Sequence, residues 1–508
     1  MLKTLIRQGH SNKAVSRMVL GRPMACRYKA TNFHRPDSAG SNDASQAADA
    51  AATVLADQND IQKLPNKATW MDALREREKQ KAAGKTLDSY SYINPKTTEV
   101  GEKTRSESFS YLTLPFKDDK WLCDSYMNAS GRLRAGQLFQ DLDALAGRIA
   151  YRHCSPAEPV NVTASVDRIY MVKKVDEIQN YNFVLAGAVT WTGRSSMEIS
   201  VKGYAFEGPI PESITEETLP IENVFLSANF TFVARNPITH KSFAINRLLP
   251  VVEKEWLDYR RAESRNAKKK LAAKTLKVIE PTDEESKLIH EMWKSSKSLE
   301  AKKDTPRNFS FMKDTSVSST LYMQPQYRNR HSYMIFGGYL LRQSFELAYC
   351  ASAAFAKAAP RFVSLDSTTF KAPVPVGSVL SMTATVSYTE HIHEKGVPYN
   401  DTPFGFSLPA TNKLSSNPEA FLSECGTLIQ VRVDTTIKHL ESTEAKESGT
   451  FIYSFFLPKD SKDEEVDYCS IMPQTYSEMM EYVEGRRRAQ DTANFVDTLP
   501  DTSAKPKL

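Results

Sequence analysis

Several features that would assign the chain to a specialised class of protein are missing from its sequence. The six cysteines are scattered, without the close pairs of a metal or redox motif, as expected for a reducing compartment. No run of about 18 apolar residues occurs, so we expect no transmembrane segment. A Gly-x-Ser-x-Gly elbow, a P-loop and a Rossmann fingerprint are also lacking. The sequence therefore predicts no metal, no redox cofactor and no nucleophilic serine of the usual kind.

Acidic residues are absent from residues 1–36, whereas the same stretch contains eight lysines and arginines. Basic residues spaced among apolar and hydroxylated ones are typical of mitochondrial transit peptides, and we expect removal near residues 27–30. The expected location is the mitochondrial matrix, and a disordered basic tail is the alternative. Because the eight positive charges of this stretch exceed the net charge of +5 of the whole chain, the remaining residues carry a small net negative charge. That balance argues against nucleic acid as a partner.

The rest of the sequence has the composition of a globular protein. It contains 41% hydrophobic and 25% charged residues over 508 positions, enough for two or three domains. After the transit peptide, the pattern predicts a linker and helical extension, a first domain, a charged helical connector, a second domain, and a C-terminal helix with a polar tail (37–99, 100–250, 251–305, 306–460 and 461–508). We expect the connector to be solvated, with a basic docking patch as the alternative.

The two predicted domains have the same order of elements. In the first, "AGQLFQDLDALAGRIAY" has apolar residues at helical spacing and is followed by β-branched and aromatic runs (Leu138, Leu142, Leu145 and Ile149). In the second, a glycine pair opens a helix that is again followed by such runs. Asp167 matches Asp366 at an offset of 199, and Gly136 matches Gly338 at 202, which indicates a duplication. A buried helix followed by antiparallel strands predicts an α+β fold in which a curved sheet wraps the helix.

The glycines at the two helix starts indicate a candidate reactive site. Gly337 and Gly338 leave the first free N–H groups uncovered, so a ligand carbonyl can approach them as in an oxyanion hole, and Gly136 holds the matching place. Asp143 follows Gly136 by seven residues, on the face where a carboxylate can polarise a water aimed at that carbonyl. Glu346 follows Gly338 by eight residues, about 100° from that phase. The plainer interpretation is a tight turn with acids that cap polar neighbours.

Four arginines precede the glycines at the two predicted helix starts (Arg132, Arg134, Arg328 and Arg330). Guanidinium groups bind phosphates well, so these side chains are candidates for contacts with a phosphorylated ligand. Solvated surface residues are the alternative.

Three stretches together resemble a known family: "FTFVARNPITHKSFAINRLLP", "MQPQYRNRHSYMIFGGYLLRQSFELAY" and "FVSLDSTTFKAPVPVGSVL". They are similar to the mitochondrial tandem hot-dog acyl-CoA thioesterases of the acyl-coenzyme A thioesterase 9 group, over about residues 100–490. The resemblance implies an α+β tandem (double) hot-dog fold, two antiparallel sheets each wrapping a central helix. It also implies hydrolysis of acyl-CoA to CoA and a free acid. We further expect a homo-oligomer.

The resemblance also implies roles for particular residues. In similar enzymes, the acid on the helix of one half acts with an Asn or His from the entry loop of the other half. By position, Asn128 matches the loop amide, Asp143 matches the helix acid, and residues 337–338 match the oxyanion glycines. In the second loop the polar candidate is His331 or Asn329.

Departures from the family pattern leave the active pairing open. The first copy has one glycine where a pair is common. In the second copy Phe345 holds the place of the acid, with Glu346 one step later. The working site is therefore either Asn128 with Glu346 or Asp143 with the His331 loop.

The function we expect is hydrolysis of an acyl-CoA by water that Asp143 or Glu346 activates, or through a transient anhydride on the acid. Asn128 or His331 orients the thioester or the water. The irregular second acid motivates another hypothesis, a non-catalytic acyl-CoA binding or scaffold protein of a mitochondrial assembly. A hot-dog hydratase is disfavoured because it needs a His and Asp pair at the helix entry.

Overall fold

The computed structural model describes residues 98–157, 159–236, 239–274, 280–301, 309–329, 334–366, 368–392, 410–411, 425–440, 444–458 and 470–496. The predicted transit peptide and nearly all of the N-terminal extension lie outside these ranges. Within them, no helix is both long enough and apolar enough to cross a membrane.

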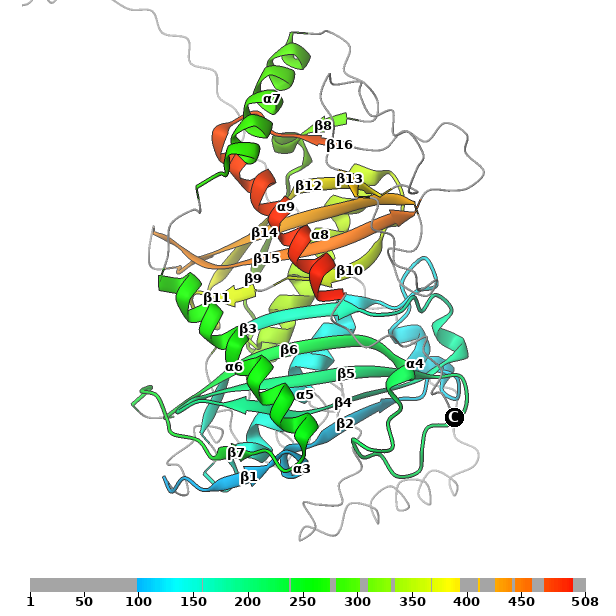
Figure 1. Ribbon diagram of the computed structural model, residues 1–508, viewed down its shortest axis with the longest axis vertical. Helices are drawn as coiled ribbons and strands as arrows, with labels where there is room; N and C mark the ends of the chain where they lie inside the picture. The colour runs from blue at the N-terminus through cyan, green and yellow to red at the C-terminus, as the bar shows by residue number, and fades with distance from the viewer. Residues whose placement is uncertain are drawn as a thin grey trace, which may run out of the picture. The chain divides into compact units, whose positions relative to one another are not determined.

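The first half of the fold wraps an antiparallel sheet around one long helix (Figure 1). The helix, α5 (Ala135–Cys154), buries the apolar residues that its spacing placed on one face, including Leu138 and Ile149. Five strands form the sheet in the order β2-β4-β5-β6-β3: β2 (Ser110–Leu114), β3 (Val160–Met171), β4 (Asn182–Thr192), β5 (Ser196–Phe206) and β6 (Val224–Arg235).

The second half repeats this arrangement around α8 (Gly337–Ala356). Its strands are β9 (Val317–Tyr322), β10 (Arg361–Leu365), β11 (Thr368–Phe370), β12 (Val379–Ile392), β14 (Gly426–Lys438) and β15 (Ala445–Pro458). Their order, β9-β12-β14-β15-β10, matches that of the first half strand for strand. A register shift also recurs, in β4 after Val189 and in β12 after Val386. The predicted duplication and the tandem hot-dog fold are confirmed.

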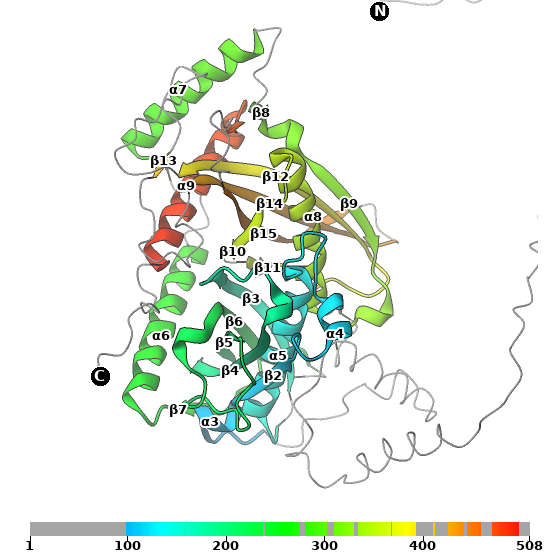
Figure 2. The same ribbon diagram turned by 90° about the vertical axis from the view of Figure 1, so that its right-hand side faces the viewer.

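The two sheets join edge to edge rather than remaining separate. Ser364 of β10 pairs with Tyr170 of β3, and Thr368 of β11 pairs with Val166, both in antiparallel fashion. In the described part of the chain the result is one 12-stranded sheet, with α5 and α8 on the same side of it (Figure 2).

Two further helices, α6 (Glu253–Lys274) and α9 (Tyr476–Val496), cover the opposite side of the sheet (Figures 1 and 2). Glu198 of β5 has no exposed surface, accepts a hydrogen bond from Asn266 Nδ2 at 3.0 Å and forms an ion pair with Arg265. Gln430 of β14 donates to the Gly485 carbonyl of α9 at 3.2 Å. One face of α6 is thus docked on the sheet, because a buried carboxylate there needs cationic and amide partners, while most of its described side chains are exposed as expected for a connector.

Shorter elements complete the described chain. Within the described chain three strand pairs are parallel: β1 with β7, β8 with β16, and β12 with β13. The bounds are β1 (Glu102–Thr104), β7 (Arg247–Leu249), β8 (Phe309–Phe311), β13 (Ala410–Thr411), β16 (Ser470–Met472), α3 (Arg105–Ser108), α4 (Lys120–Ser125) and α7 (Asp283–Glu300).

The central helices α5 and α8 pack against each other where the halves meet. The rings of Phe139 and Phe345 lie edge to face with centroids 5.1 Å apart. Arg342 Nη1 donates to Gln137 Oε1 at 2.8 Å and to Gln140 Oε1 at 3.2 Å. This crossing brings the start of each helix against the middle of the other, so any site at a helix start is built from both halves.

Candidate active site

Asp143 of α5 lies against the first turn of α8. Its Oδ2 accepts a hydrogen bond from the Gly338 amide at 2.7 Å, and its Oδ1 accepts one from the Thr163 hydroxyl at 2.9 Å. Because the N-cap residue Phe336 offers α8 no side-chain cap, the carboxylate satisfies an amide that the helix start leaves open. From the residue spacing alone, Asp143 was expected to act at Gly136, at the start of its own helix. The structure places it with the helix start of the other half.

The Asp143 carboxylate is completely buried, and this decides its protonation. Burial raises its pKa from 3.8 to about 6, although the hydrogen bonds from Thr163 and Gly338 act in the lowering direction. Loss of water therefore disfavours the charged form by more than the two bonds stabilise it. Burial also raises the pKa of Glu198 and of Asp366, so the contact with a helix start, and not the pKa alone, sets Asp143 apart. A buried acid that titrates near neutral pH suits general-base chemistry.

The glycine pair at the start of α8 is required by close approach of the other half. A Cβ at Gly337 would lie 3.1 Å from Asp143 Oδ2 and 3.3 Å from Thr163 Oγ1. A Cβ at Gly338 would lie 2.6 Å from the ring of Phe336, in the same half, and 3.0 Å from the backbone of Gln140, in the other half. Without side chains, the two residues let the carboxylate reach the backbone amide directly.

Thr163 is a site residue that the sequence did not indicate. It lies on β3, is nearly buried, and its hydroxyl holds the second oxygen of Asp143. The available signal was a hydroxyl side chain at a buried position of the strand that follows the acid. That signal is weak, because threonine is common in strands.

The start of α5 meets α8 in the corresponding way, but no buried acid stands there. A Cβ at Gly136 would lie 3.1 Å from the ring of Phe345 and 3.3 Å from Oε1 of Glu346. Glu346 forms an ion pair with Arg134, whose Nε and Nη2 both lie 2.9 Å from Oε1. The Glu346 side chain is 37% exposed. One helix start therefore faces a buried acid, and the other faces a ring and a solvated ion pair.

Asn128 lies in the loop before α5 and shapes its backbone. Its Oδ1 accepts hydrogen bonds from the amides of Ser130 at 2.9 Å and Arg132 at 3.0 Å. Asn128 also lines a hollow beside Glu346, so the predicted pair of Asn128 and Glu346 borders the same space.

The loops before α5 and α8 are closed by corresponding bridges at their described ends. A bridge between Met127 and Leu133 closes the first loop, and one between Arg328 and Ile335 closes the second. The residue after the first bridge position is Asn128 in one loop and Asn329 in the other. Asn329 is thus the structural counterpart of Asn128. His331 lies outside the described residues.

Two of the four arginines predicted to meet phosphates, Arg132 and Arg134, form ion pairs within the protein. Arg132 Nε lies 3.6 Å from Asp176 Oδ1, and Arg134 binds Glu346. Arg328 is half-buried at the second loop, and Arg330 lies outside the described residues.

These features define a class. The protein has a tandem hot-dog fold whose candidate active site takes its acid from one half and its helix start from the other. Within the described ranges, no cluster of three His, Cys, Asp or Glu is placed to hold a metal ion.

Sequence comparisons identify the family. No family model matches the chain. It is 35% identical to acyl-coenzyme A thioesterase 2, chloroplastic, of Humulus lupulus over 60% of this chain and 68% of that protein. Acyl-coenzyme A thioesterase 4, mitochondrial, of the same plant is 35% identical over 58% of this chain, which spans 55% of that relative's length. Acyl-coenzyme A thioesterase 9, mitochondrial, of Homo sapiens is 26% identical over 82% of this chain and 84% of its own. The chain belongs to the acyl-CoA thioesterase family, as the resemblance indicated.

Proposed function

We propose that this chain is a mitochondrial acyl-CoA thioesterase. Its active site is formed by Asp143 of α5 and by the start of α8, against which Asp143 lies. The reaction is acyl-CoA plus water to CoA and a free carboxylic acid. The observation that carries the proposal is a fully buried carboxylate hydrogen-bonded to the glycine-lined first turn of a helix, in a member of this family. The acid-free basic leader and the mitochondrial relatives support the location, and the matrix is the expected compartment.

The first step is the binding of the thioester carbonyl at the start of α8. The amide of Gly338 donates to Asp143 Oδ2 at 2.7 Å. When the carbonyl oxygen takes this place beside the Gly337 amide, Asp143 loses a bond that lowers its pKa and becomes a stronger base. Backbone donors aimed at the developing oxyanion stabilise the tetrahedral transition state. Because Asp143 has no exposed surface, the substrate enters only when the residues around the helix start move.

The second step is proton transfer. Asp143 takes a proton from a water whose oxygen attacks the carbonyl carbon, the carbon–sulfur bond breaks, and the CoA thiolate regains a proton from the acid. Thr163 keeps Oδ1 engaged, and Oδ2, which the carbonyl frees from Gly338, accepts the proton of the water. Direct attack by Asp143 to form a transient anhydride is the alternative.

Glu346 is the weaker candidate for the base. Its Oε1 is held by two nitrogens of Arg134, and the side chain is 37% exposed, so the carboxylate is stabilised in its charged form and is not sheltered from water. Phe345, which occupies the place equivalent to Asp143, has no group that can accept a proton.

A free-thiol assay with short, medium and long acyl-CoA esters tests the proposal. The wild type should release CoA, and the double variant Asp143→Asn/Glu346→Gln should lose at least about 100-fold in rate while it keeps its circular dichroism spectrum. Glu447→Gln, which removes an exposed carboxylate paired with Lys371, is the control and should retain activity. A fully active double variant contradicts the mechanism. A wild type that binds acyl-CoA and releases no thiol supports the non-catalytic binding protein instead.

A further inference from the structure

Polar contacts join the facing sides of α5 and α8 at intervals of one helical turn. On α8 they involve Gly338, Arg342 and Glu346, which are four positions apart. On α5 and its N-cap they involve residues three positions apart (Arg134, Gln137, Gln140 and Asp143). Residues at these spacings lie on one face of a helix. We call the contact of Gly338 the inner contact, that of Arg342 the middle contact and that of Glu346 the outer contact.

The middle contact ties one side chain of α8 to two turns of α5. Arg342 Nη1 donates to Gln137 Oε1 at 2.8 Å and to Gln140 Oε1 at 3.2 Å. Because the donor is charged, these hydrogen bonds are stronger than bonds between neutral groups. Gln140 has no exposed surface, so water does not compete for its oxygen.

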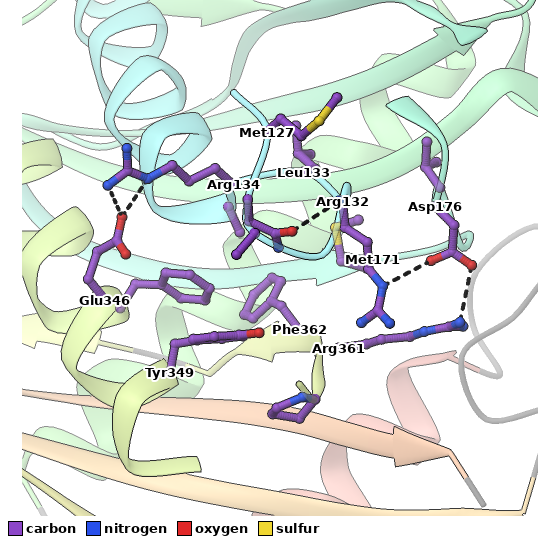
Figure 3. A pocket seen from close by; sticks show the side chains of 16 residues that line it. Met127, Arg132, Leu133, Arg134, Met171, Asp176, Glu346, Tyr349, Arg361 and Phe362 are labelled. Carbon is purple, nitrogen blue, oxygen red and sulfur yellow. Dashed lines mark hydrogen bonds and ion pairs between the residues drawn. The ribbon is translucent and has the colours of Figure 1, made fainter. Parts of the chain in front are cut away.

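The outer contact is weaker (Figure 3). Arg134 Nη2 lies 2.9 Å from Glu346 Oε1, but the two side chains are 39% and 37% exposed. Ion pairs that are open to solvent contribute little to stability. The middle contact is therefore the one whose loss should displace α5 on α8.

The middle contact lies one helical turn from the inner contact, where Asp143 meets Gly338. Asp143 follows Gln140 by about 4.5 Å along α5, and Gly338 precedes Arg342 by about 6 Å along α8. A Cβ at Gly338 would lie 3.0 Å from Gln140 Cα, so the helices approach closely at this point. A small slide or rotation of one helix on the other therefore changes both contacts together.

Apolar packing fixes the position of α5 on α8 less tightly. The rings of Phe139 and Phe345 hold the helices together, but hydrophobic attraction is non-directional. The middle contact also has a cost, because Arg342 Nε and Gln140 Nε2 are buried without partners in the described structure. Such a contact adds little stability, whereas its two hydrogen bonds fix the direction in which the helices meet.

The middle contact joins equivalent positions of the two halves. Gln140 and Arg342 are separated by the offset of 202 that relates Gly136 to Gly338. A Cβ at Gly136 would lie 3.5 Å from Arg342 Cγ, just as one at Gly338 would meet Gln140. Two arginines at these positions would repel each other, and two glutamines would lack the charge. An arginine against a glutamine gives a charge-assisted contact without like charges facing each other.

We propose that Arg342 is a positioning residue for thioester hydrolysis. By holding Gln137 and Gln140, it keeps α5 in the register in which the Asp143 carboxylate meets the first turn of α8. It acts through α5 and not on the substrate. The inference deepens the proposed function and rests on it, because it takes Asp143 as the base.

Steady-state kinetics of Arg342→Leu in the full chain test the inference. Without the middle contact Asp143 shifts, so kcat should fall by about 10-fold while KM changes by no more than about 2-fold, since a misplaced base acts on the chemical step. Arg342→Lys, which keeps the positive charge on a more flexible side chain, should recover part of the loss. Arg487→Leu is the matched control. It removes an arginine that joins α9 to Glu285 of α7, and kcat should not change.

The amide of Gly338 provides a readout that does not depend on activity. Its acceptor is Asp143 of the other half, because the start of a helix offers its own amides no acceptor. In hydrogen-exchange mass spectrometry, this amide should exchange about 3-fold or more faster in Arg342→Leu than in the wild type, because one hydrogen bond is weakened. Exchange in Arg487→Leu should match the wild type.

A second variant, Gln137→Leu, covers the case in which Arg342→Leu fails to fold. It removes only the shorter bond of the middle contact, from a half-buried side chain, and should change kcat and Gly338 exchange in the same direction by a smaller amount. If kcat and Gly338 exchange in the folded variants equal those of the wild type, the inference is overturned. Lower thermal stability of Arg342→Leu with unchanged kcat also overturns it, because the contact would then serve only the fold.

Failure of this inference and failure of the proposed function give different results. Wild type that releases thiol, with Arg342→Leu unchanged in kcat and exchange, leaves the function standing and removes the positioning role. Wild type that releases no thiol, with faster Gly338 exchange in Arg342→Leu, removes the function and leaves Arg342 as the residue that sets the contact of Asp143.

Discussion

The two helix starts differ in the residue that faces them, and their glycines differ accordingly. Residues 337–338, both glycine, face the carboxylate of Asp143, whereas Ala135 and Gly136 face the ring of Phe345. A carboxylate that must reach a backbone amide requires two residues without side chains. A ring that packs on the helix start tolerates an alanine at the first of them. One site therefore has both the buried acid and the first glycine, and the equivalent positions of the other site have neither. This is the difference expected if only the Asp143 site is catalytic, as we propose.

Among the variants that test this difference between the two helix starts, we expect the largest loss of activity from Gly337→Ala. The new methyl would lie 3.1 Å from Asp143 Oδ2, closer than ordinary contact, so the carboxylate must shift. Because a misplacement of about 1 Å costs about 100-fold, a shift of a few tenths of an ångström in the base should lower kcat/KM for thiol release by about 10-fold to 100-fold. Gly136→Ala is the matched control, because its methyl would lie 3.1 Å from Phe345 at the other start. Equal losses in the two variants would contradict a functional difference between the sites.

A smaller effect is expected from Thr163→Val, which removes the hydroxyl on Asp143 Oδ1 but keeps the shape of the side chain. The bond lowers the pKa of Asp143, so its loss should raise the pKa above about 6. The wild-type rate should fall as the pH drops below about 6, and in the variant this fall should begin at higher pH. We expect about a 10-fold loss at neutral pH from one charge-assisted bond. Thr163→Ser should restore the profile, and an unshifted profile in the valine variant would argue against Asp143 as the titrating group.

The smallest effect concerns the stability of the folded chain. The pKa of Asp143 rises from 3.8 to about 6 on folding, so below pH 3.8 its burial adds no cost, and the cost grows until the pH passes 6. The rise corresponds to at most roughly 3 kcal/mol at pH 8. Asp143→Asn should therefore unfold at a higher temperature than the wild type at pH 8, and this advantage should shrink towards pH 4. Lower stability of the variant at both pH values would mean that Asp143 is only a stabilising cap.

Much of the fold could be predicted from the sequence because its signals are local. The spacing of Leu138 and Ile149 gave the central helix, and two copies of the same order of elements gave the duplication. The fusion of the sheets through β3 and β10 could not be predicted, because edge pairing depends on partners far apart in the chain. The docking of α6 also depended on a distant partner, Glu198, whose burial no periodicity indicates.

The sequence indicated residues of the candidate site but not which of them contact each other. Glycines at a helix start and an acid on a helix face are visible in the sequence, and Asp143 and Gly338 were both singled out. Their contact joins residues 195 positions apart, and only the crossing of α5 and α8 creates it. The choice between Asp143 and Glu346 likewise depended on burial and on the ion pair with Arg134, which spacing does not reveal.

The most direct test of the central claim compares kcat/KM for Asp143→Asn and Glu346→Gln with the same acyl-CoA at pH 8. The account predicts a loss of about 100-fold or more for the first variant, because the base is gone, and a change of no more than a few-fold for the second, because an exposed ion pair contributes little. Full activity in Asp143→Asn together with a collapse in Glu346→Gln would contradict it and move the active site to the start of α5.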